Sequence, residues 1–372
     1  MKIVIVGGGI TGLSAAWFLN KRYGKNAKIT LLEKTNRLGG WIQTDYEKGL
    51  LFERGPRTFQ FGKCETLLKL IQQLGLTVIR SDPTANKRYL FHQGRLRSMG
   101  SFIPLLFPYA IRELFLPRGK GDDESIYDFA SRRFSPKIAD TLFDPLTLGV
   151  YAGDIRKLSI RACFPTLFNW EKEKGSVIRG LFSAPKREKG LFTLQNGMQT
   201  LIDELQKQLP IEIVLNCKAE VIKDNEVLAG GKIWTADLVI RALPPEIPAK
   251  SIWVVNLAFH GKGLSKKGFG YLVPSQEKES VLGAIFDSSI FPQQNGSDET
   301  RMTVMVREEE KKPLEAALRG VERHLKIRDK PFYSSVFYAQ KAIPQFEVGC
   351  GYVDGISVEA CVQRGIRFSL QD

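Results

Sequence analysis

The 372-residue sequence predicts an α/β fold, elaborated toward α+β, with a nucleotide-binding domain, an antiparallel-sheet domain and a helical region. Three observations support this prediction. A glycine-rich turn near the N-terminus lies between a β-branched run and a helical pattern. Long alternating stretches between Ile252 and Val306 indicate an antiparallel sheet, and a helix-rich segment separates the two.

The N-terminal residues predict a strand, a turn and a helix. Lys2–Val6 is a β-branched apolar run, Gly7–Gly12 follows, and apolar residues then recur at helical spacing from Leu13 to Leu19. The turn has the form G-x-G-x-x-G, in which the glycines allow a tight turn, close approach to a pyrophosphate, and contact between helix and strand. The pattern therefore predicts a Rossmann-like dinucleotide site, with the helix N-terminus facing an anion.

An acidic residue and a second glycine motif extend this site. Ile29–Leu32 predicts a second strand that ends at Glu33, 21 positions after Gly12, where a carboxylate can accept hydrogen bonds from a ribose. A bare G-x-G-x-x-G also occurs as a turn with no ligand, but this spacing favours a dinucleotide. The following Arg37-Leu38-Gly39-Gly40-Trp41 resembles the Arg-x-Gly-Gly extension of the flavin-containing amine oxidase superfamily. That resemblance implies FAD.

The composition limits the class of protein. With 43% hydrophobic and 25% charged residues, the chain is expected to be globular. Its formal net charge of +14 suggests a nucleic acid, an anionic membrane surface or an acidic substrate as partner. The sequence contains no nucleic-acid-binding module. The charge is therefore weak evidence for a membrane surface.

Cysteine and histidine are sparse and isolated. The five cysteines form no C-x-x-C pair and no secretory leader precedes Lys2, which predicts a reducing, cytoplasmic compartment. The three histidines, His92, His260 and His324, stand alone, so no metal site is expected. No run reaches the ~18 apolar residues of a spanning helix, and the protein is not expected to be integral.

The elements before residue 100 follow from local patterns. Ile42–Tyr46 and Leu50–Phe52 predict a hairpin that turns at Gly49. Glu65–Leu74 predicts an amphipathic helix that Gly75 ends. Strands are expected at Thr77–Ile79 and Arg88–His92.

Ser101–Leu116 admits two interpretations. The segment is rich in large apolar residues and is interrupted by Pro104 and Pro108. It can form a kinked core helix. Alternatively, the prolines and the basic flank at Arg118 and Lys120 suit a segment that lies in a membrane interface. The second interpretation predicts that this segment inserts into a membrane interface and belongs to a membrane-associating region.

The remaining elements are predicted from caps, turns and periodicity. Residues 125–148 are expected to be helical and to be broken by Gly149–Asp154, and a further helix runs through Trp170. A helix at 198–209 and short strands at 211–215, 220–223, 232–235 and 238–240 follow. Longer strands are expected at 252–259, 269–273, 281–286, 302–306 and 334–338, with helices at 313–325 and after the loop 349–358.

The nucleotide-binding domain is predicted to be discontinuous. The FAD-binding domain is expected over 1–60, 190–245 and 346–372, the substrate-binding domain over 61–90 and 246–345, and the helical, membrane-associating region over 91–189.

Several blocks resemble the oxygen-dependent protoporphyrinogen oxidases of the same superfamily. They are Phe52–Arg57, Asn86–Tyr89, Gly149–Asp154 with Leu158–Arg161, Phe269–Pro274 and Ala342–Gln345. The resemblance runs nearly end to end. It implies an enzyme of heme biosynthesis that takes six electrons from protoporphyrinogen IX through FAD to dioxygen and releases hydrogen peroxide. It also implies peripheral attachment to the inner face of the cell membrane, and two candidate partners, ferrochelatase and a second copy of the chain.

The resemblance assigns the site residues. Flavin contacts fall on Gly7, Gly8, Gly9, Ile10, Thr11, Gly12, Glu33, Lys34, Arg37, Gly39, Gly40, Trp41, Gly55, Pro56, Arg57, Thr58, Val221, Ile356, Ser357 and Val358. Substrate contacts fall on Arg88, Gly149, Phe269, Leu272 and Met305. Arg88 would pair with a propionate and the Gly149 carbonyl would accept from a pyrrole N–H. No catalytic side chain is expected, because the flavin carries the chemistry.

Two segments are shorter than in the family, between Leu243 and Ser251 and after Gln345, so the flavin domain is expected to lack a strand. Two alternative functions remain open. One is oxidation of coproporphyrinogen III, whose four propionates would favour more basic groups than Arg88 alone. The other is a flavin-binding heme-pathway partner without turnover.

Overall fold

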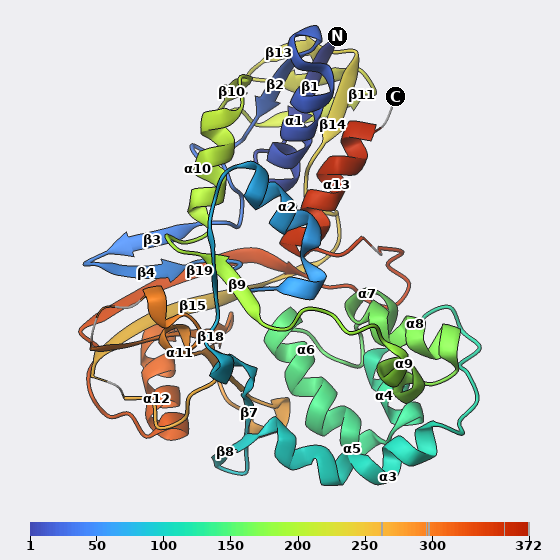
Figure 1. Cartoon of the computed structure of the whole chain (residues 1–372), viewed down its shortest axis with the longest axis vertical. Coiled ribbons are helices and arrows are strands. Elements are labelled where there is room, and N and C mark those ends of the chain that lie inside the picture. Colours follow the sequence, from blue (N-terminus) through green and yellow to red (C-terminus); the bar gives the residue numbers. More distant parts are fainter. Residues whose placement is uncertain (262, 295, 297, 353, 371–372) are drawn as a thin grey trace. The chain divides into compact units, whose positions relative to one another are not determined.

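The computed structural model describes residues 1–261, 263–294, 296, 298–352 and 354–370 (Figure 1). The chain divides into two compact units. The first is Met1–Arg80, Arg187–Pro245 and Asp354–Asp372, and the second is Ser81–Lys186 and Glu246–Val353. Residues 61–80, which the sequence grouped with the antiparallel sheet, therefore lie in the first unit. The predicted helical region and the predicted antiparallel sheet lie together in the second.

A four-stranded parallel sheet forms the centre of the first unit. Its strand order is β10 (Glu212–Val214), β2 (Lys28–Leu32), β1 (Lys2–Val6) and β14 (Leu238–Arg241). The last four residues of β1 and of β2 are buried. A parallel strand covered on both faces reads as a continuous apolar run, which is why the sequence located these two strands. The described residues between Pro344 and Val358 add no strand to this sheet.

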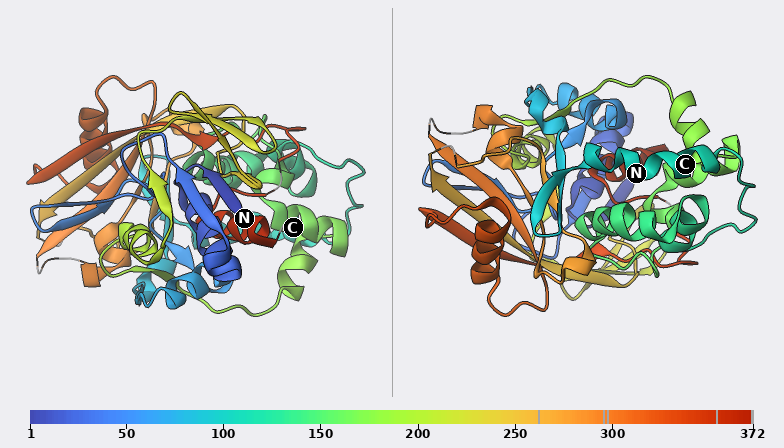
Figure 2. Two further views of the ribbon diagram at one scale, coloured as in Figure 1. Left: turned by 90° about the horizontal axis from the view of Figure 1, so that it is seen from above. Right: turned by 90° about the horizontal axis from the view of Figure 1, so that it is seen from below.

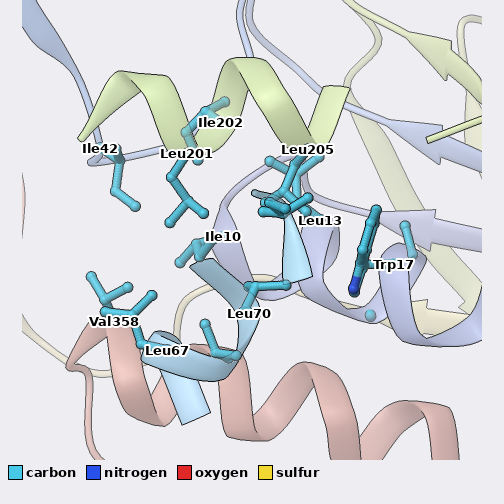
Figure 3. Packing of buried hydrophobic residues seen from close by; sticks show 14 of the residues in the cluster. Ile10, Leu13, Trp17, Ile42, Leu67, Leu70, Leu201, Ile202, Leu205 and Val358 are labelled. Carbon is cyan, nitrogen blue, oxygen red and sulfur yellow. The ribbon is translucent and has the colours of Figure 1, made fainter. Parts of the chain in front are cut away.

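Four helices pack together in the first unit. They are α1 (Ile10–Tyr23), α2 (Glu65–Gln73), α10 (Gln199–Gln208) and α13 (Val358–Leu370). Figure 3 shows Ile10 and Leu13 of α1 between side chains of α10 above and of α2 and α13 below. Gly365 permits a close crossing, because a Cβ there would lie 2.9 Å from the carbonyl oxygen of Thr11.

Smaller sheets complete the first unit. Their strands are β3 (Thr44–Glu47) with β4 (Leu50–Glu53), β5 (Phe59–Gln60) with β9 (Leu191–Leu194) and β6 (Val78–Arg80), and β11 (Ala219–Lys223) with β12 (Glu226–Ala229) and β13 (Lys232–Thr235). Strand β12 was not predicted from the sequence. Its side chains alternate between buried and less buried, as in a strand with one face on a core.

A seven-stranded sheet forms the centre of the second unit. In spatial order its strands are β19 (Tyr333–Pro344), β15 (Ala249–His260), β18 (Glu299–Arg307), β17 (Val281–Ile285), β16 (Gly270–Leu272), β7 (Arg88–His92) and β8 (Arg95–Ser98). All neighbours are antiparallel except β7 and β16. The alternating stretches of the sequence thus form the predicted antiparallel sheet. β19 is longer than predicted.

One face of this sheet packs against α12 (Pro313–Leu325), drawn in orange in Figure 2. Tyr89, Phe91, Tyr271 and Val304 are buried on this face. Residues at the alternate positions, including Leu282 and Val254, form a separate buried cluster on the other face. That second cluster includes Leu148 of the helical region.

The rest of the second unit is helical, and the teal and green helices gather in one group (Figure 2). The helices are α3 (Ile103–Glu113), α4 (Ile126–Arg133), α5 (Pro136–Ile138), α6 (Asp144–Tyr151), α7 (Ile160–Cys163), α8 (Pro165–Lys174), α9 (Val177–Ser183) and α11 (Asp287–Ile290). A π-helical turn at Ala139–Phe143 joins α5 to α6. Helix α6 ends inside the predicted break Gly149–Asp154: it continues to Tyr151, three residues past Leu148, and stops where Ala152 adopts a left-handed conformation.

The segment with two interpretations forms α3. Pro104 lies in its first turn, where no backbone donor is lost, and Pro108 lies inside the helix. Leu105, Leu106 and Tyr109 pack against the helical core, whereas Ile103 and Phe107 are each 63% exposed. Among the described residues, no helix combines the length and the apolarity that crossing a membrane requires.

Candidate flavin and substrate sites

The loop between β1 and α1 has room for a ligand at one of its three motif glycines. At Gly7, whose φ is +111°, a Cβ would lie 2.6 Å from the carbonyl oxygen of Ala242. At Gly12 a Cβ would lie 2.0 Å from the carbonyl oxygen of Gly7. At Gly9 a Cβ would meet no described atom within 4 Å. Gly7 and Gly12 are thus required by the protein's own packing, whereas the open space at Gly9 leaves backbone accessible to a phosphate.

The N-terminus of α1 supplies the electrostatics of this loop. Gly9 precedes the helix as its N-cap and provides no side chain that could bond the first-turn N–H groups. Such groups carry partial positive charge and bind anions. The loop geometry therefore fits a dinucleotide pyrophosphate.

Glu33 is held at the end of β2 and is buried. Its Oε2 accepts from the Gly8 N–H at 2.7 Å, and its Oε1 accepts from the N–H and the hydroxyl of Thr35, both at 2.8 Å. A carboxylate has about four acceptor sites, so capacity for a ribose hydroxyl remains. The neighbouring Lys34 is exposed.

The Arg37–Trp41 segment is bound to the glycine loop. The Gly39 N–H donates to the Gly8 carbonyl at 2.8 Å, and Gly39 and Gly9 form a parallel bridge. The Arg37 guanidinium donates to the Gly40 carbonyl at 2.7 Å and also to that of Ile42. Burial, followed by the charge of Arg54, lowers the pKa of Arg37. In this structure Arg37 shapes its own loop.

Residues 55–58 join the same loops. A Cβ on Gly55 would lie 2.0 Å from the Trp41 carbonyl oxygen, so the two backbones touch. Arg57 is buried and donates to the Glu53 carbonyl at 2.8 Å, whereas Pro56 and Thr58 are half-buried. Three segments that are distant in sequence therefore converge in the first unit.

The last flavin residues predicted from the sequence lie at two further places in the first unit. Val221 is half-buried on β11 and packs against the cluster that contains Val4 and Leu32. Val358 opens α13 and is buried, and Figure 3 shows it below Ile10. Ile356 and Ser357 are exposed. The donor set, the carboxylate and the open space at Gly9 together fit FAD. Among the described residues, no cluster of side chains could hold a metal ion.

All five substrate residues predicted from the sequence lie in the second unit. Arg88 opens β7, and its guanidinium lies 5.1 Å from the centroid of the Phe269 ring. Phe269 is held there because its N–H donates to the Lys87 carbonyl at 2.8 Å. Arg88 is exposed by its surface area, yet the protein around the guanidinium lowers its pKa through desolvation. A cation beside an aromatic face suits a carboxylate with an apolar body.

Leu272, Gly149 and Met305 form a continuous wall. A Cβ on Gly149 would lie 2.2 Å from Cδ2 of Leu272, so α6 touches β16 at this point. Leu272 pairs with Gly283 of β17, which in turn pairs with Met305 of β18. Gly283 places no side chain between the other two.

Strand alternation puts these side chains on one face. Tyr89 and Tyr271 lie in the core against α12. Their neighbours Arg88, Leu90 and Leu272 must therefore project to the opposite face, where Met305 packs against the cluster containing Leu148. Arg88, Leu272 and Met305 therefore lie on the face that α12 does not cover, and Gly149 meets Leu272 there. Phe269 precedes β16 and is brought to this group by its contact with Arg88.

The end of α6 leaves the Gly149 carbonyl accessible. The N–H of Ala152 donates to the Leu148 carbonyl at 2.9 Å, and the left-handed conformation of Ala152 stops the helix. No described N–H donates to the Gly149 carbonyl, and Gly149 is exposed. The last carbonyls of a helix lack intrahelical partners, so this group can accept a ligand's hydrogen bond.

Two relevant residues escaped the sequence analysis. Ile285 pairs with Gly270, which pairs with Arg88, so Ile285 lies beside the arginine across a residue without a side chain. Asp144 is buried on α6 and accepts from the Ser275 N–H at 2.7 Å. Strand register could have indicated Ile285 once the pairing was known. No local sequence pattern predicted the hydrogen bond between Asp144 and Ser275.

Comparisons with known proteins agree with this arrangement. The family model described as flavin containing amine oxidoreductase matches residues 10–331. The protoporphyrinogen oxidase of Bos taurus is 32% identical over 93% of this chain and 88% of its own length. The coproporphyrinogen III oxidase of Bacillus subtilis is also 32% identical, but over 56% of this chain and 51% of its own length.

Solved structures share the fold. A crystal structure from Exiguobacterium sp. 255-15, of a candidate protoporphyrinogen oxidase, has a TM-score of 0.84 at 21% identity and covers 99% of this chain and 98% of its own. The family match covers most of the chain and confirms the superfamily inferred from the glycine motifs. The chain belongs to the flavin containing amine oxidoreductase family and is an FAD-dependent oxidoreductase.

Proposed function

We propose that this protein oxidises protoporphyrinogen IX to protoporphyrin IX in heme biosynthesis, with dioxygen as acceptor and hydrogen peroxide as by-product. One observation carries the proposal: Arg88 lies beside Phe269, on the same sheet as an apolar wall made by Leu272, Gly149 and Met305. Relatives named protoporphyrinogen oxidase match nearly the whole chain. A flat apolar macrocycle with propionates needs such a surface.

Each substrate residue has a distinct role in this proposal. The Arg88 guanidinium binds a propionate, because guanidinium groups remain protonated in proteins and match the geometry of a carboxylate. The Gly149 carbonyl accepts from a pyrrole N–H. Phe269, Leu272 and Met305 contact the macrocycle, and Ile285 lies at the same edge as Arg88.

The cofactor residues hold FAD in the first unit. The loop Gly7–Gly12 binds the pyrophosphate and Glu33 binds a ribose. The convergent segments at Arg37–Trp41 and Gly55–Thr58, with Val221 and Ile356–Val358, complete the cofactor contacts. FAD, when bound, accepts hydride from the substrate and delivers electrons to dioxygen. The protein therefore supplies binding and orientation, and needs no acid–base pair.

Anaerobic mixing tests this function. Purified FAD-loaded protein is mixed with protoporphyrinogen IX, coproporphyrinogen III or buffer, and flavin absorbance is followed in a stopped-flow instrument. We expect fastest bleaching with protoporphyrinogen IX and peroxide release when air is admitted. Faster bleaching by coproporphyrinogen III would assign the alternative substrate. Persistent yellow colour with both would favour a binding protein without turnover.

We also propose that α3 attaches the protein to an anionic membrane surface. Ile103, Phe107, Ile111 and Phe115 recur at four-residue spacing, and each is between 48% and 80% exposed. Leu181 and Phe182 of α9 are exposed as well, and α9 contacts α3. A stripe of large apolar residues with Arg118, Lys120 and Arg179 nearby in the chain suits the interface of an anionic bilayer.

A buried polar network holds the inner side of α3. Glu113 and Arg133 are fully buried and form an ion pair. Glu113 also accepts from the Val177 N–H at 2.8 Å, at the start of α9. The network fixes α3 and α9 together, and in this proposal the exposed apolar side chains of both helices enter the same membrane surface. The proposed location is cytoplasmic, on the inner face of the cell membrane. Contacts with ferrochelatase or with a second copy stay predictions of the resemblance.

A further inference from the structure

The carbonyl groups at the end of α6 are not equivalent. The Leu148 carbonyl accepts from the Ala152 N–H, and the Tyr151 carbonyl accepts from the side-chain amide of Gln345 at 2.8 Å. The Gly149 carbonyl has no donor among the described residues. The hydrogen bonds of this helix end therefore occupy the Leu148 and Tyr151 carbonyls, and the Gly149 carbonyl, like that of Val150, is left to accept from a ligand.

Gln345 binds the helix end to two strands. It is 7% exposed and lies just after β19. Its Nε2 also donates to the Ile343 carbonyl at 3.2 Å, and its backbone N–H donates to the Pro248 carbonyl at 2.8 Å, just before β15. A Cβ on Gly153 would lie 2.7 Å from Gln345 Oε1, so the side chain fills the space beside the turn after α6.

The other end of α6 is fixed as well. Asp144 accepts from the Ser275 N–H at 2.7 Å, just beyond β16, and Gly149 touches Leu272 within β16. Burial raises the pKa of Asp144. The helix is thus fixed along the strand that carries the substrate wall, and Gln345 fixes the turn at which its carbonyls become available.

We infer that Gln345 is a positioning residue for the substrate. It occupies the Tyr151 carbonyl and fixes the turn at Ala152, so that the Gly149 carbonyl is presented at a defined place beside Leu272 to an N–H of the macrocycle. This inference rests on the proposed function. It assigns to Gln345 a role in recognising a tetrapyrrole N–H donor, although the residue itself touches no substrate.

Gln345→Leu tests the inference, because it keeps the size of the side chain and removes its donors. Asp123→Asn is the matched control. Asp123 accepts from Ser159 Oγ at 2.7 Å, from the Glu124 N–H at 2.9 Å and from the Gly349 N–H at 3.3 Å in the same unit. None of these three partners lies on α6. FAD content, hydrogen exchange of residues 144–155 and the steady-state constants with protoporphyrinogen IX are measured for both variants and for wild type.

Loss of the Gln345 side-chain hydrogen bonds should accelerate amide hydrogen exchange at residues 144–155 in Gln345→Leu. Asp123→Asn should leave that exchange unchanged. KM should rise about three- to tenfold, the equivalent of one neutral hydrogen bond. FAD content and kcat should stay the same, because the lost contact contributes equally to substrate and transition state. If Gln345→Leu does not load FAD, Gln345→Glu replaces it, since a carboxylate at this position also lacks the donors.

Two results would overturn this inference without affecting the proposed function. One is unchanged hydrogen exchange in the Gln345 variant, and the other is faster hydrogen exchange with an unchanged KM. A control variant with the same rise in KM would do so too, because the effect would then be general destabilisation. Wild-type protein that holds FAD but oxidises no porphyrinogen would overturn the proposed function, and with it the substrate that Gln345 is inferred to position.

Discussion

Single residues in this protein differ sharply in why they are required. Gly12 and Gly7 are needed by the fold itself, because a Cβ at either would meet backbone. Gly9 is different, since the described protein leaves space around it. Arg88 is likewise outside the core: it is exposed by its surface area at the start of its strand, although its guanidinium contacts Phe269. Residues that the fold does not need are the ones whose loss should affect ligands selectively.

Gly9→Ala should separate cofactor binding from folding. The φ of Gly9 is −73°, which alanine adopts freely. We expect the free energy of unfolding of the FAD-free protein to fall by no more than about 1 kcal/mol, which is the scale of an N-cap substitution. FAD occupancy should fall strongly, because a methyl group would fill the phosphate approach. Urea unfolding of FAD-free protein and flavin titration check both points. Gly12→Ala, the comparison, should destabilise the protein even without FAD.

Arg88→Ala should weaken substrate binding and leave the flavin undisturbed. Loss of a hydrogen bond to a charged group typically costs about 1.5–3 kcal/mol, which corresponds to a rise in KM of about ten- to a hundredfold. Arg88→Lys should recover part of this loss, because it keeps the charge without the planar fork. Steady-state kinetics at measured FAD occupancy provide the test. Arg95→Ala, at an exposed position of β8, is the control, and equal effects would argue against the assignment.

His324 should make the stability of the protein depend on pH. Its Nδ1 lies 3.0 Å from the Tyr271 hydroxyl, and its ring lies 3.9 Å from that of Phe91. Burial, followed by the charge of Arg323, lowers the pKa of His324 to about 4. Because the unfolded state binds the proton more tightly, stability is present in full above pH ~6.5 and falls as the pH drops toward 4.

Protonation of His324 in the unfolded state should lower the free energy of unfolding by about 3 kcal/mol across that pH range, at 1.36 kcal/mol per pKa unit. Urea unfolding of wild type and of His324→Gln at pH 4.5, 5.5 and 7 measures it. The variant should show a flatter dependence, because glutamine does not titrate. Parallel curves for the two proteins would show that other groups cause the pH dependence.

At the scale of elements, helices here depend on side chains from distant segments. The N-terminus of α2 has no side-chain cap of its own. Its first N–H groups donate instead to Glu359 of α13, from Thr66 at 3.1 Å and from Leu67 at 2.8 Å. Glu359 is buried, so the two helices are joined by charge-assisted hydrogen bonds at the positive end of α2.

Glu359→Ala should destabilise the first unit by about 2 kcal/mol, the scale of a buried hydrogen bond to a charged group. Thermal unfolding with excess FAD measures the loss. Glu65→Gln serves as the control on the same helix turn. Glu65 is exposed, and its interaction with the helix dipole is worth about 0.5 kcal/mol. Equal losses in the two variants would contradict a specific cap by Glu359.

At the scale of the whole molecule, the net charge of +14 and the apolar stripe on α3 point to the same partner. Large apolar side chains that are exposed to water lower the free energy of the system when they enter a bilayer interface. Scattered positive charge adds attraction to anionic lipids. Neither observation is decisive alone. Together they are the grounds on which we propose that the exposed face of α3 attaches to a membrane.

Phe107→Ser with Ile111→Ser should release the protein from vesicles. Wild type is expected to sediment with vesicles containing phosphatidylserine and to dissociate at high salt. Tyr46→Ser is the control, because Tyr46 is another exposed aromatic residue, 61% exposed, outside α3. Sedimentation of the double variant like wild type would exclude α3 as the attachment site. A wild type that never sediments would exclude membrane attachment.

Much of the flavin site could be predicted from the sequence because its signals are local. The apolar run of β1, the glycine loop and Glu33 lie within 33 residues, and their spacing reflects one strand, one helix and one further strand. The alternating stretches of β15 and β18 likewise gave the antiparallel sheet. A side-chain period of two is a property of the strand itself and needs no knowledge of its partners.

The tertiary structure decided what depends on partners distant in sequence. Helix α6 passes Gly149 because its end is set by Ala152 and Gln345, which lie 193 positions apart. Arg37 turns to carbonyls of its own loop, and Glu359 caps a helix that begins almost 300 residues earlier. Such contacts leave no periodic trace, because a hydrogen bond requires only that two groups meet in space. The sequence by itself determined the strands, the glycine loop and the chemistry they can hold; packing decided which carbonyls, charges and apolar faces remain available.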